Sequence, residues 1–460
     1  MTTSPAPAAA IAQLRSDFEG RSIGPDDVDY DKARTVVAGH IDRRPALIVR
    51  PTDASEVARV VAFARETGLP LAVRCGGHSG AGHSVVDDGI VLDLGNLTAL
   101  EIDAEGRTAW AQTGLTAAAV TAAAAEHELA IGFGDTGSVG IGGITLGGGH
   151  GYLSRVHGLT IDNLLAAEIV TADGQIIVAD ENNHPDLFWA IRGGGGNFGV
   201  ATRFHYRLRE LGQIVGGMML LPATPETVEG FVAACEAAPE HLSAIGNVMP
   251  APPMPFVPEE QHGKLAILGL ICWSGPVEEG EAAIAPFRAL GEPLADMVQP
   301  MPYPGMYPPD DEEYRPLAVA RTMFVDWVDG NVAELIIDRL ESSDAPMRVV
   351  QLRPMGGAIA RVPVDATAFA HRNSKIMTNV ASFYLGPDDK PIREQWVSEL
   401  SGQLRQDDAG AYVNFLGDDG PDAVRAAYPG ATWDRLTQIK AAYDPDNLFR
   451  LNQNVPPAAS

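Results

Sequence analysis

The chain has few cysteines, a shortage of basic residues and no long apolar run. Its three cysteines, Cys75, Cys235 and Cys272, lie far apart and form no C-x-x-C pair. An odd and widely spaced set favours a reducing compartment over a disulfide framework. No apolar run reaches about 18 residues, the length that a membrane-spanning helix needs. We therefore expect no membrane partner.

The shortage of positive charge excludes a further class of partner. Lys and Arg number 33 against 60 Asp and Glu, which gives a formal net charge of -27. Binding to nucleic acid requires clustered Lys and Arg, so we expect no nucleic-acid partner. No H-E-x-x-H motif and no Cys/His ligand set occurs, so we expect no metal. Residues 1–14 lack the basic start of a signal peptide, and we expect a cytoplasmic protein.

The length and composition are those of a soluble globular protein with more than one domain. Of the 460 residues, 45% are apolar and 20% are charged. A chain of this length is expected to form two or three domains. The composition changes near residue 213 and again near residue 404. We therefore expect domains at 1–213, 214–404 and 405–460.

Hydrophobic periodicity predicts strands and helices along most of the chain. The segment between Asp53 and Gly68 combines a capping box, helical apolar spacing and a terminal glycine, as a helix does. In the first domain we also expect helices at 116–127 and 185–192 and strands at 46–50, 71–74, 89–94, 109–113, 166–171, 175–179 and 200–208. In the second we expect helices at 225–237, 278–290 and 331–343 and strands at 264–273, 318–325, 347–353 and 377–384. The third segment predicts a strand around Tyr412 and a helix at 433–443.

Many of the 49 glycines are gathered into clusters. Gly76-Gly77, the segment 137–143 and the segment 147–151 all fall within about 80 residues of sequence. Glycine permits positive φ and a close approach of another molecule to the main chain. Exposed amides in such segments bind pyrophosphate well. The three clusters together predict a bound ligand.

Two common nucleotide-binding motifs are excluded. Residues 132–137 formally match G-x-G-x-x-G, but a Rossmann site needs a strand before this motif and a helix directly after it. The residues that follow are glycine and β-branched residues, which start a helix poorly. A Walker P-loop is absent because no G-K-[ST] occurs.

Several motifs in order resemble one family. They are R-C-G-G-H-S at 74–79, G-I-G-G-I-T-L-G-G-G-H-G at 140–151, G-L-T-I-D-N at 158–163 and the segment 185–199, followed by Y-x-N at 412–414, Y-D-P-D-N-L-F at 443–449 and N-Q-N-V at 452–455. This set resembles the FAD-linked oxidases of the vanillyl-alcohol-oxidase superfamily, in the berberine-bridge-enzyme-like subgroup. The resemblance covers residues 43–213 and 405–456.

The resemblance implies an α+β fold in two parts. A PCMH-type FAD-binding domain contains two small sheets. A substrate domain carries a large antiparallel sheet backed by helices, and the C-terminal segment returns to the FAD-binding domain.

The resemblance also implies that FAD is bonded covalently to His78, whose imidazole is a suitable nucleophile. Some relatives attach the flavin a second time through a cysteine, where this chain has Thr136, so we expect a single covalent link. Val139 falls where relatives have a residue on the route to the flavin ring, and a valine there is compatible with oxygen access. For His83 a structural role is favoured. The other expected FAD contacts, mostly through the backbone, are Arg74, Gly76, Gly77, Ser79, Ser138, Gly140, Gly143, Gly147, Gly148, Gly151, Asn163, Val170, Asn452 and Asn454. The glycines at 193–196 are either a further contact or a structural turn.

Tyr412 is the candidate for catalysis. Hydride removal from a C–H bond is easier when the neighbouring O–H or N–H loses its proton, and a tyrosine accepts that proton if its pKa falls below about 10. The alternative is a tyrosine that only packs in a sheet. Asn414, two residues on, shares a strand face with Tyr412 and orients substrate or flavin. Gln351, with Arg353 on the same strand face, is a further candidate for the pocket.

A few other residues favour structural roles. The pair His371-Arg372 matches a family pair and is expected to be structural. Four aromatic residues either shape a pocket or pack in the core, and core packing is favoured; they are Tyr303, Tyr307, Trp273 and Trp327.

The sequence therefore predicts an FAD-dependent oxidase. Its substrate is an alcohol or amine carbon of a small organic molecule or secondary metabolite, and its second partner is dioxygen, which is released as hydrogen peroxide. The alternatives are a dehydrogenase with another electron acceptor and a flavin-bearing binding protein without turnover.

Overall fold

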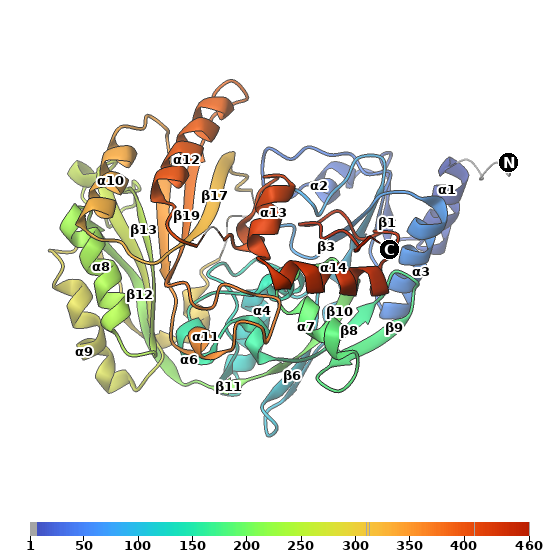
Figure 1. Ribbon diagram of the computed structural model, residues 1–460, viewed down its shortest axis with the longest axis horizontal. Coiled ribbons are helices and arrows are strands. Elements are labelled where there is room, and N and C mark those ends of the chain that lie inside the picture. Colours follow the sequence, from blue (N-terminus) through green and yellow to red (C-terminus); the bar gives the residue numbers. More distant parts are fainter. Residues whose placement is uncertain (1–6, 310, 312, 409, 460) are drawn as a thin grey trace.

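The computed structural model describes residues 7–309, 311, 313–408 and 410–459 and has two lobes side by side (Figure 1). The first lobe holds residues up to about 211 together with the C-terminal segment. The second lobe holds the large sheet. The domain boundaries expected near 213 and 404 stay predictions.

A four-stranded sheet forms one part of the first lobe, in the order β1-β2-β4-β3. β2, β4 and β3 are parallel, and β1 pairs antiparallel with β2. The helix between β2 and β3 begins after Asp53, whose carboxylate accepts a hydrogen bond from the Glu56 amide, and ends at Gly68 with φ 70°. This confirms the predicted strand–helix–strand unit. The elements are α1 (Pro7–Asp17), β1 (Ser22–Ile23), α2 (Tyr30–Arg34), β2 (Leu47–Val49), α3 (Ala54–Thr67), β3 (Leu71–Arg74), β4 (Ile90–Asp93) and η1 (Leu94–Asn96).

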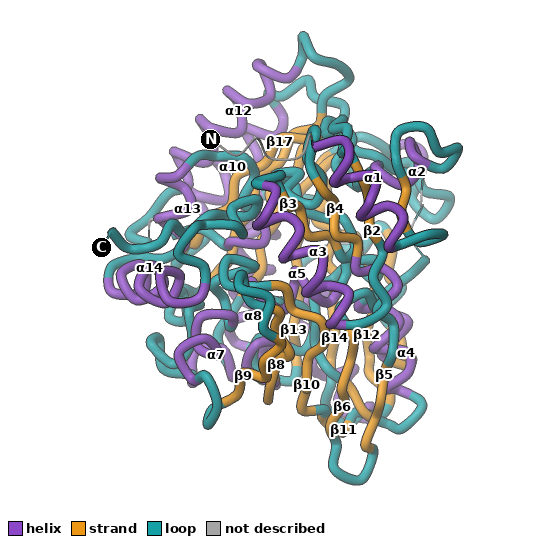
Figure 2. The backbone as a smooth tube through the Cα atoms, turned by 90° about the vertical axis from the view of Figure 1, so that its right-hand side faces the viewer, coloured by secondary structure: helices purple, strands orange, loops and turns teal. Residues whose placement is uncertain are grey.

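A five-stranded antiparallel sheet forms the other part of the first lobe, in the order β5-β6-β10-β8-β9 (Figure 2). Its elements are β5 (Leu100–Asp103), β6 (Thr108–Gln112), α4 (Ala117–Ala125), β8 (Leu164–Val170), β9 (Ile176–Asp180), α7 (Pro185–Ile191) and β10 (Val200–Arg207). A short ribbon pairs β7 (Leu129–Ala130) with β11 (Arg209–Glu210). The two small sheets expected of the FAD-binding domain are therefore present.

The second lobe is one antiparallel sheet in the order β15-β12-β14-β13-β18-β19-β17, and β16 also pairs with β12. The helices α8, α9, α10 and α12 cover its outer face (Figure 1). Each helix and strand predicted for this part of the chain is present, although the prediction lacked β12, β13, β15, β16, α11, α12 and the two 3-10 turns. The elements are β12 (Gln213–Pro222), α8 (Pro225–Ala237), β13 (Leu242–Pro250), η3 (Glu259–Gln261), β14 (Leu265–Trp273), α9 (Val277–Arg288), β15 (Ala295–Asp296), β16 (Gln299–Pro302), η4 (Tyr303–Met306), β17 (Ala318–Val325), α10 (Gly330–Glu341), β18 (Arg348–Pro354), α11 (Ala358–Arg361), β19 (Ile376–Phe383) and α12 (Lys390–Leu404).

The C-terminal segment returns to the first lobe, where α14 lies across it (Figure 1). The elements are η5 (Val413–Phe415), α13 (Pro421–Ala427) and α14 (Ala431–Tyr443). Lys440 of α14 is fully buried, and its Nζ donates hydrogen bonds to the carbonyls of Asn197 and Phe449 at 2.7 and 3.0 Å. The strand expected around Tyr412 is wrong. This stretch crosses between the lobes and forms the 3-10 turn η5, and its described residues pair with no strand.

The glycine-dense region contains a helix, α5 (Ile141–Gly147), followed by α6 (Ser154–His157) and η2 (Thr160–Asn163). These residues were expected to start a helix poorly, yet a helix begins at Ile141. The helix packs closely against the loop after β3, where a Cβ on Gly142 would overlap the Cys75 Sγ. Tertiary packing of this kind overrides low helix propensity. The Rossmann arrangement is still absent, since the preceding strand β7 pairs only with β11.

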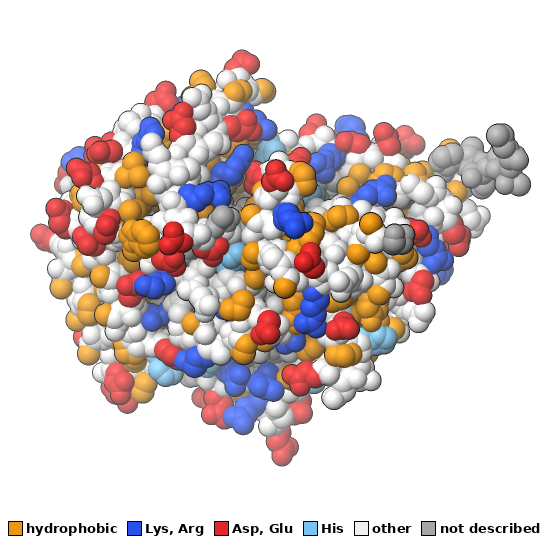
Figure 3. All heavy atoms as spheres, viewed as in Figure 1, with side chains coloured by type: hydrophobic (Ala, Val, Ile, Leu, Met, Phe, Trp, Pro, Cys, Tyr) orange, Lys and Arg blue, Asp and Glu red, His pale blue; other side chains and the backbone are white. Residues whose placement is uncertain are grey.

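Charged side chains are spread over the face shown in Figure 3, and acidic residues appear on both lobes. Among the described residues, no helix is both long and apolar enough to cross a membrane.

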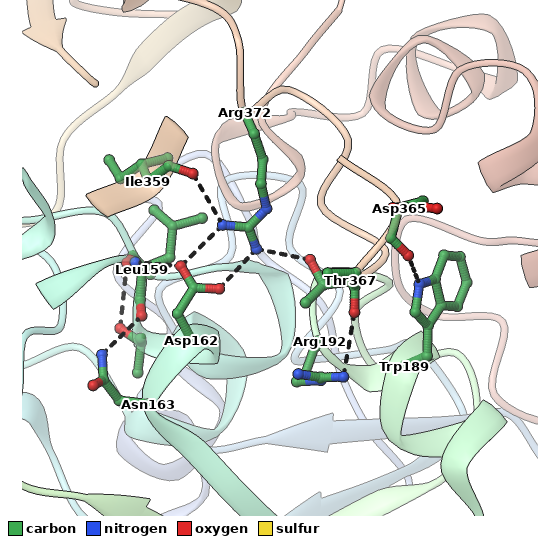
Figure 4. Close-up of polar contacts among 12 residues, drawn as sticks. Leu159, Asp162, Asn163, Trp189, Arg192, Ile359, Asp365, Thr367 and Arg372 are labelled. Atoms are coloured by element: carbon green, nitrogen blue, oxygen red, sulfur yellow. Dashed lines mark hydrogen bonds and ion pairs between the residues drawn. The ribbon is translucent and has the colours of Figure 1, made fainter. Parts of the chain in front are cut away.

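The loop between β18 and β19 fastens the two lobes together (Figure 4). Arg372 is fully buried and forms a bidentate ion pair with Asp162, at 2.7 and 2.9 Å. It also donates to the hydroxyl of Thr367 at 2.8 Å. Nearby, Nε1 of Trp189 donates to the carbonyl of Asp365 at 2.7 Å. These contacts set the position of the large sheet relative to the first lobe.

Candidate functional site

A cavity lies where the two lobes and the C-terminal segment meet. Its walls come from the loop after β3, the segment around α5, the loop before β10, β18, the stretch 412–416 that contains η5, and residues 449–453. The expected site residues that line it are Gly76, Gly77, His78, Ser79, Thr136, Val139, Gly140, Gly143, Tyr412, Asn414 and Asn452.

His78 occupies the loop that leaves β3. Gly77 has φ 72°, a left-handed conformation that favours glycine, and this turns the chain so that His78 faces the cavity. The ring nitrogen Nε2 of His78 lies 3.0 Å from the hydroxyl of Ser138. This hydrogen bond fixes the orientation of the imidazole, since the partner of one ring nitrogen determines the role of the other.

The cavity walls fit FAD. A Cβ added to Gly143 or Gly196 would meet no atom within 4 Å, so both backbones open onto space in which a ligand can approach closely. Besides the two ring nitrogens of His150, three polar atoms of the lining are buried without a hydrogen-bond partner among the described residues, and a ligand would satisfy them. They are the Asn452 Oδ1, the Ser84 Oγ and the His83 Nε2.

Tyr412 is almost fully buried at the cavity wall. Its hydroxyl accepts hydrogen bonds from the backbone amide of Gly149 at 2.8 Å and from Nδ2 of Asn414 at 3.0 Å. Burial raises the pKa of Tyr412, while these two donors and the charge of Arg353 act in the opposite direction. Desolvation outweighs the donors, so the pKa of Tyr412 lies above the ordinary value for tyrosine.

A buried ion pair lies in the same wall. Nη2 of Arg353 lies 2.6 Å from the Asp135 carboxylate, and its Nε donates to the side chain of Gln351 at 2.7 Å. The guanidinium also lies over the ring of Phe415, 4.8 Å from its centroid. Asp135 and Arg353 both line the cavity, so the wall beside Tyr412 is charged but compensated.

Comparison with known proteins identifies the family. A family model for an FAD binding domain matches residues 45–180, and a model described as berberine and berberine like matches residues 411–456. An FAD-linked oxidoreductase of Dictyostelium discoideum is 30% identical, over 90% of this chain and 89% of its own length. The chain belongs to the berberine-bridge-enzyme-like family of FAD-linked oxidoreductases. It is an FAD-dependent oxidoreductase, as the sequence predicted.

Further relatives and solved structures agree. The (R)-6-hydroxynicotine oxidase of Paenarthrobacter nicotinovorans is 28% identical, over 96% of this chain and 98% of its own. The crystal structure of 6-hydroxy-D-nicotine oxidase from Arthrobacter nicotinovorans has a TM-score of 0.84 at 26% identity and covers 96% of this chain and 98% of that one. BBE-like 1 of Physcomitrella patens has a TM-score of 0.87 at 22% identity, with 98% and 100% covered, which shows the fold alone. The α+β fold with a PCMH-type FAD-binding domain and a large antiparallel sheet is confirmed.

Several residues expected to contact FAD in this oxidoreductase lie outside the cavity lining. Arg74 is buried in an ion pair with Asp93 at 2.9 Å. Asn163 stabilises the turn before it, because its Nδ2 donates to the carbonyl of His157 at 3.0 Å. Ser138 forms a hydrogen bond with His78 and is not itself part of the cavity lining. The others outside the lining are Gly147, Gly148, Gly151, Val170 and Asn454.

Two of these glycines support catalytic candidates. A Cβ on Gly147 would overlap the side chain of Asn414, and one on Gly148 would lie 3.1 Å from the Tyr412 ring. Glycine is needed at both positions so that the two side chains can pack against α5. Asn414 also donates to the carbonyl of Ile144 at 3.1 Å, and it reaches Tyr412 from η5 rather than from the expected strand.

The expected place of Gln351 in the pocket is corrected, because Gln351 does not line the cavity of the oxidoreductase. It bridges Arg353 and Asn247, to which its Nε2 donates at 2.8 Å, and so it supports Arg353. The cavity residues that sequence reasoning missed include Asp135 and His150. Each is a lone ionisable residue between glycines, and that context was the available signal.

The remaining candidates are structural. His371 stacks on Phe324 with ring centroids 4.5 Å apart and bonds to Asp408 at 3.1 Å. Tyr303, Tyr307 and Trp273 are buried, as core packing requires, while Trp327 is 47% exposed and fits neither role. Among the described residues, no group of His, Cys, Asp and Glu has the arrangement of a metal site.

Proposed function

We propose that this FAD-dependent oxidoreductase is an oxidase of small organic molecules. It removes two electrons and two protons from an alcohol or amine carbon and passes them to dioxygen, which becomes hydrogen peroxide. FAD, when bound, supplies the two-electron acceptor for the substrate and its reoxidation by oxygen. The observation that carries the proposal is the Tyr412 hydroxyl, held in the cavity wall by two N–H donors.

Tyr412 accepts the substrate proton at its phenolic oxygen. The amide of Gly149 and Nδ2 of Asn414 both donate to this oxygen, and such donors stabilise the phenolate form. The positive charge of Arg353 acts in the same direction. Because burial still raises the pKa of Tyr412, the basic form becomes more abundant as the pH rises, and we expect turnover to rise with pH.

His78 carries the flavin through a single covalent bond. The hydrogen bond to Ser138 and the place of His78 in the cavity support this assignment. The nearby Cys75 is unsuited to a second bond, because burial raises the pKa of its thiol to about 12. Acid-precipitated protein is expected to stay yellow, and the His78→Ala variant should release its FAD; colourless wild-type precipitate would contradict the covalent bond.

Val139 supports oxygen as the electron acceptor. It lines the cavity, and a side chain of this size is compatible with oxygen access. Anaerobic reduction by substrate followed by mixing with air tests this directly. Rapid reoxidation with release of peroxide supports an oxidase, and slow reoxidation would indicate a dehydrogenase with another acceptor.

We also propose a cytoplasmic location. All three cysteines are free, which a reducing compartment would maintain.

A further inference from the structure

His150 is a buried histidine of the cavity wall that has no hydrogen-bond partner. Its side chain is 5% exposed, and neither Nδ1 nor Nε2 has a partner among the described residues. By contrast, the equally buried His371 bonds to Asp408 and to the carbonyl of Ala427. Buried polar groups are normally satisfied, so two unpaired ring nitrogens in a cavity wall indicate a ligand contact.

His150 lies beside the catalytic candidate. The preceding residue, Gly149, donates its amide to the Tyr412 hydroxyl at 2.8 Å. The carbonyl of His150 lies 3.4 Å from Nη1 of Arg353. Tyr412 and His150 also line the same cavity, so a molecule that approaches Tyr412 there also approaches His150.

The imidazole is neutral at physiological pH. Burial and the positive charge of Arg353 lower the pKa of His150 to about 3. A neutral imidazole has one donating and one accepting nitrogen. It is suited to a hydroxyl group, which also donates and accepts.

The charges around His150 are already compensated. Arg353 pairs with Asp135 at 2.6 Å, and burial disfavours the charged form of Tyr412 by raising its pKa. An ammonium group here would face the Arg353 guanidinium without a free carboxylate, and a substrate carboxylate would have to compete with Asp135. An unpaired charge in a buried site is costly. The wall therefore favours an uncharged reacting group.

We propose that His150 binds the hydroxyl of an uncharged alcohol and that the enzyme oxidises alcohols in preference to amines. This inference rests on the proposed function, which brings the reacting carbon to Tyr412. His150 binds and orients the hydroxyl, while Tyr412 takes its proton.

The test measures how tightly the holoenzyme binds matched alcohols and amines at pH 7. Binding is detected by the change in flavin absorbance and is measured separately from turnover. Three pairs serve as probes: benzyl alcohol and benzylamine, cyclohexylmethanol and cyclohexylmethylamine, and glucose and glucosamine. We expect at least one alcohol to bind about tenfold or more tightly than its amine, the effect of one well-placed buried hydrogen bond. Amines that bind as tightly as their alcohols, or no binding by any alcohol, would overturn the inference.

Three variants identify the residue. His150→Phe should weaken alcohol binding about tenfold, and His150→Gln, which keeps a donor and an acceptor, should restore most of it. His205→Phe is the matched control, because His205 stacks on Trp110 on the five-stranded sheet and lies outside the cavity. Unchanged alcohol binding in His150→Phe overturns the inference, and so does a change in the flavin spectrum before any ligand is added, since His150 would then contact the cofactor.

The outcomes also separate the two proposals. If alcohols bind through His150 but the flavin is never reduced, the proposed oxidase function fails and the binding role of His150 stands. If amines bind as tightly as alcohols and are oxidised with release of peroxide, the oxidase function stands and the inference fails.

Discussion

The hydroxyl of Tyr412 has two N–H donors and a nearby guanidinium, yet burial prevails and its pKa is raised. Burial therefore makes the basic form of Tyr412 less abundant at neutral pH. A tyrosine in this setting relies on its donors, and their removal should be visible in the pH dependence of turnover.

Asn414→Ala removes one donor from the phenolic oxygen. The loss destabilises the phenolate, so the pKa of Tyr412 should rise further and the limb of the pH–rate profile of kcat should move to higher pH. Tyr412→Phe should abolish the limb and lower kcat by about 10²–10⁴-fold. A limb at the same pH in Asn414→Ala, or one that persists in Tyr412→Phe, would show that another group is the base.

At the scale of single elements, α5 and α14 hold the cavity walls. The backbone of α5 opens onto the cavity at Gly143, and α14 fixes the loop before β10 through the buried Lys440. The conformation of each helix depends on the packing around it.

Gly143→Val should reduce FAD content while the protein still folds. Its side chain would enter the cavity, where a Cβ meets no other atom. Gly402→Val is the matched control, since Gly402 also lies in a helix with no atom near its Cβ but is exposed on α12. The ratio of flavin to protein absorbance measures both variants, and equal FAD content would contradict a close approach of FAD to α5.

Lys440→Met should destabilise the C-terminal segment strongly. The change leaves the fully buried Asp444 without its cation, and the free energy of unfolding should fall by about 3–5 kcal/mol. Lys390→Met is the control, because its pair with Glu394 has the same i,i+4 spacing but is exposed, and it should cost at most about 1 kcal/mol. Denaturant unfolding measures both, and equal losses would contradict the structural role of Lys440.

Sequence reasoning was accurate where an element's own periodicity determines it. The helix at 225–237 and the strand at 318–325 were predicted with their observed bounds. It was wrong where packing between segments distant in the sequence decides the conformation, as in the glycine helix α5 and in η5 at Tyr412. The predicted motifs did bring His78, Tyr412 and Asn452 to one cavity. Asp135 and His150 were missed because their roles arise from contact with Arg353, which lies in the other lobe.

At the scale of the whole molecule, the site exists only where the two lobes and the C-terminal segment meet. Asp135 belongs to the first lobe, Arg353 to the large sheet and Tyr412 to the returning segment. The relative position of the lobes therefore determines the geometry of the wall.

Arg372→Met should weaken the connection between the lobes. It leaves Asp162 buried without its bidentate partner, and we expect a loss of about 3–5 kcal/mol in the free energy of unfolding. In a double-mutant cycle with Asp162→Asn, the two losses should be strongly non-additive. Additive losses would contradict a direct coupling of the lobes through this pair.

The central claim is that the protein is an FAD-dependent oxidase. The most direct measurement is to reduce the holoenzyme anaerobically with a substrate and then mix it with air-saturated buffer, while recording flavin absorbance and peroxide. The oxidase predicts rapid return of the oxidised spectrum with one peroxide formed per flavin reoxidised. A flavin that is reduced by substrate but stays reduced in air, with no peroxide formed, would contradict it.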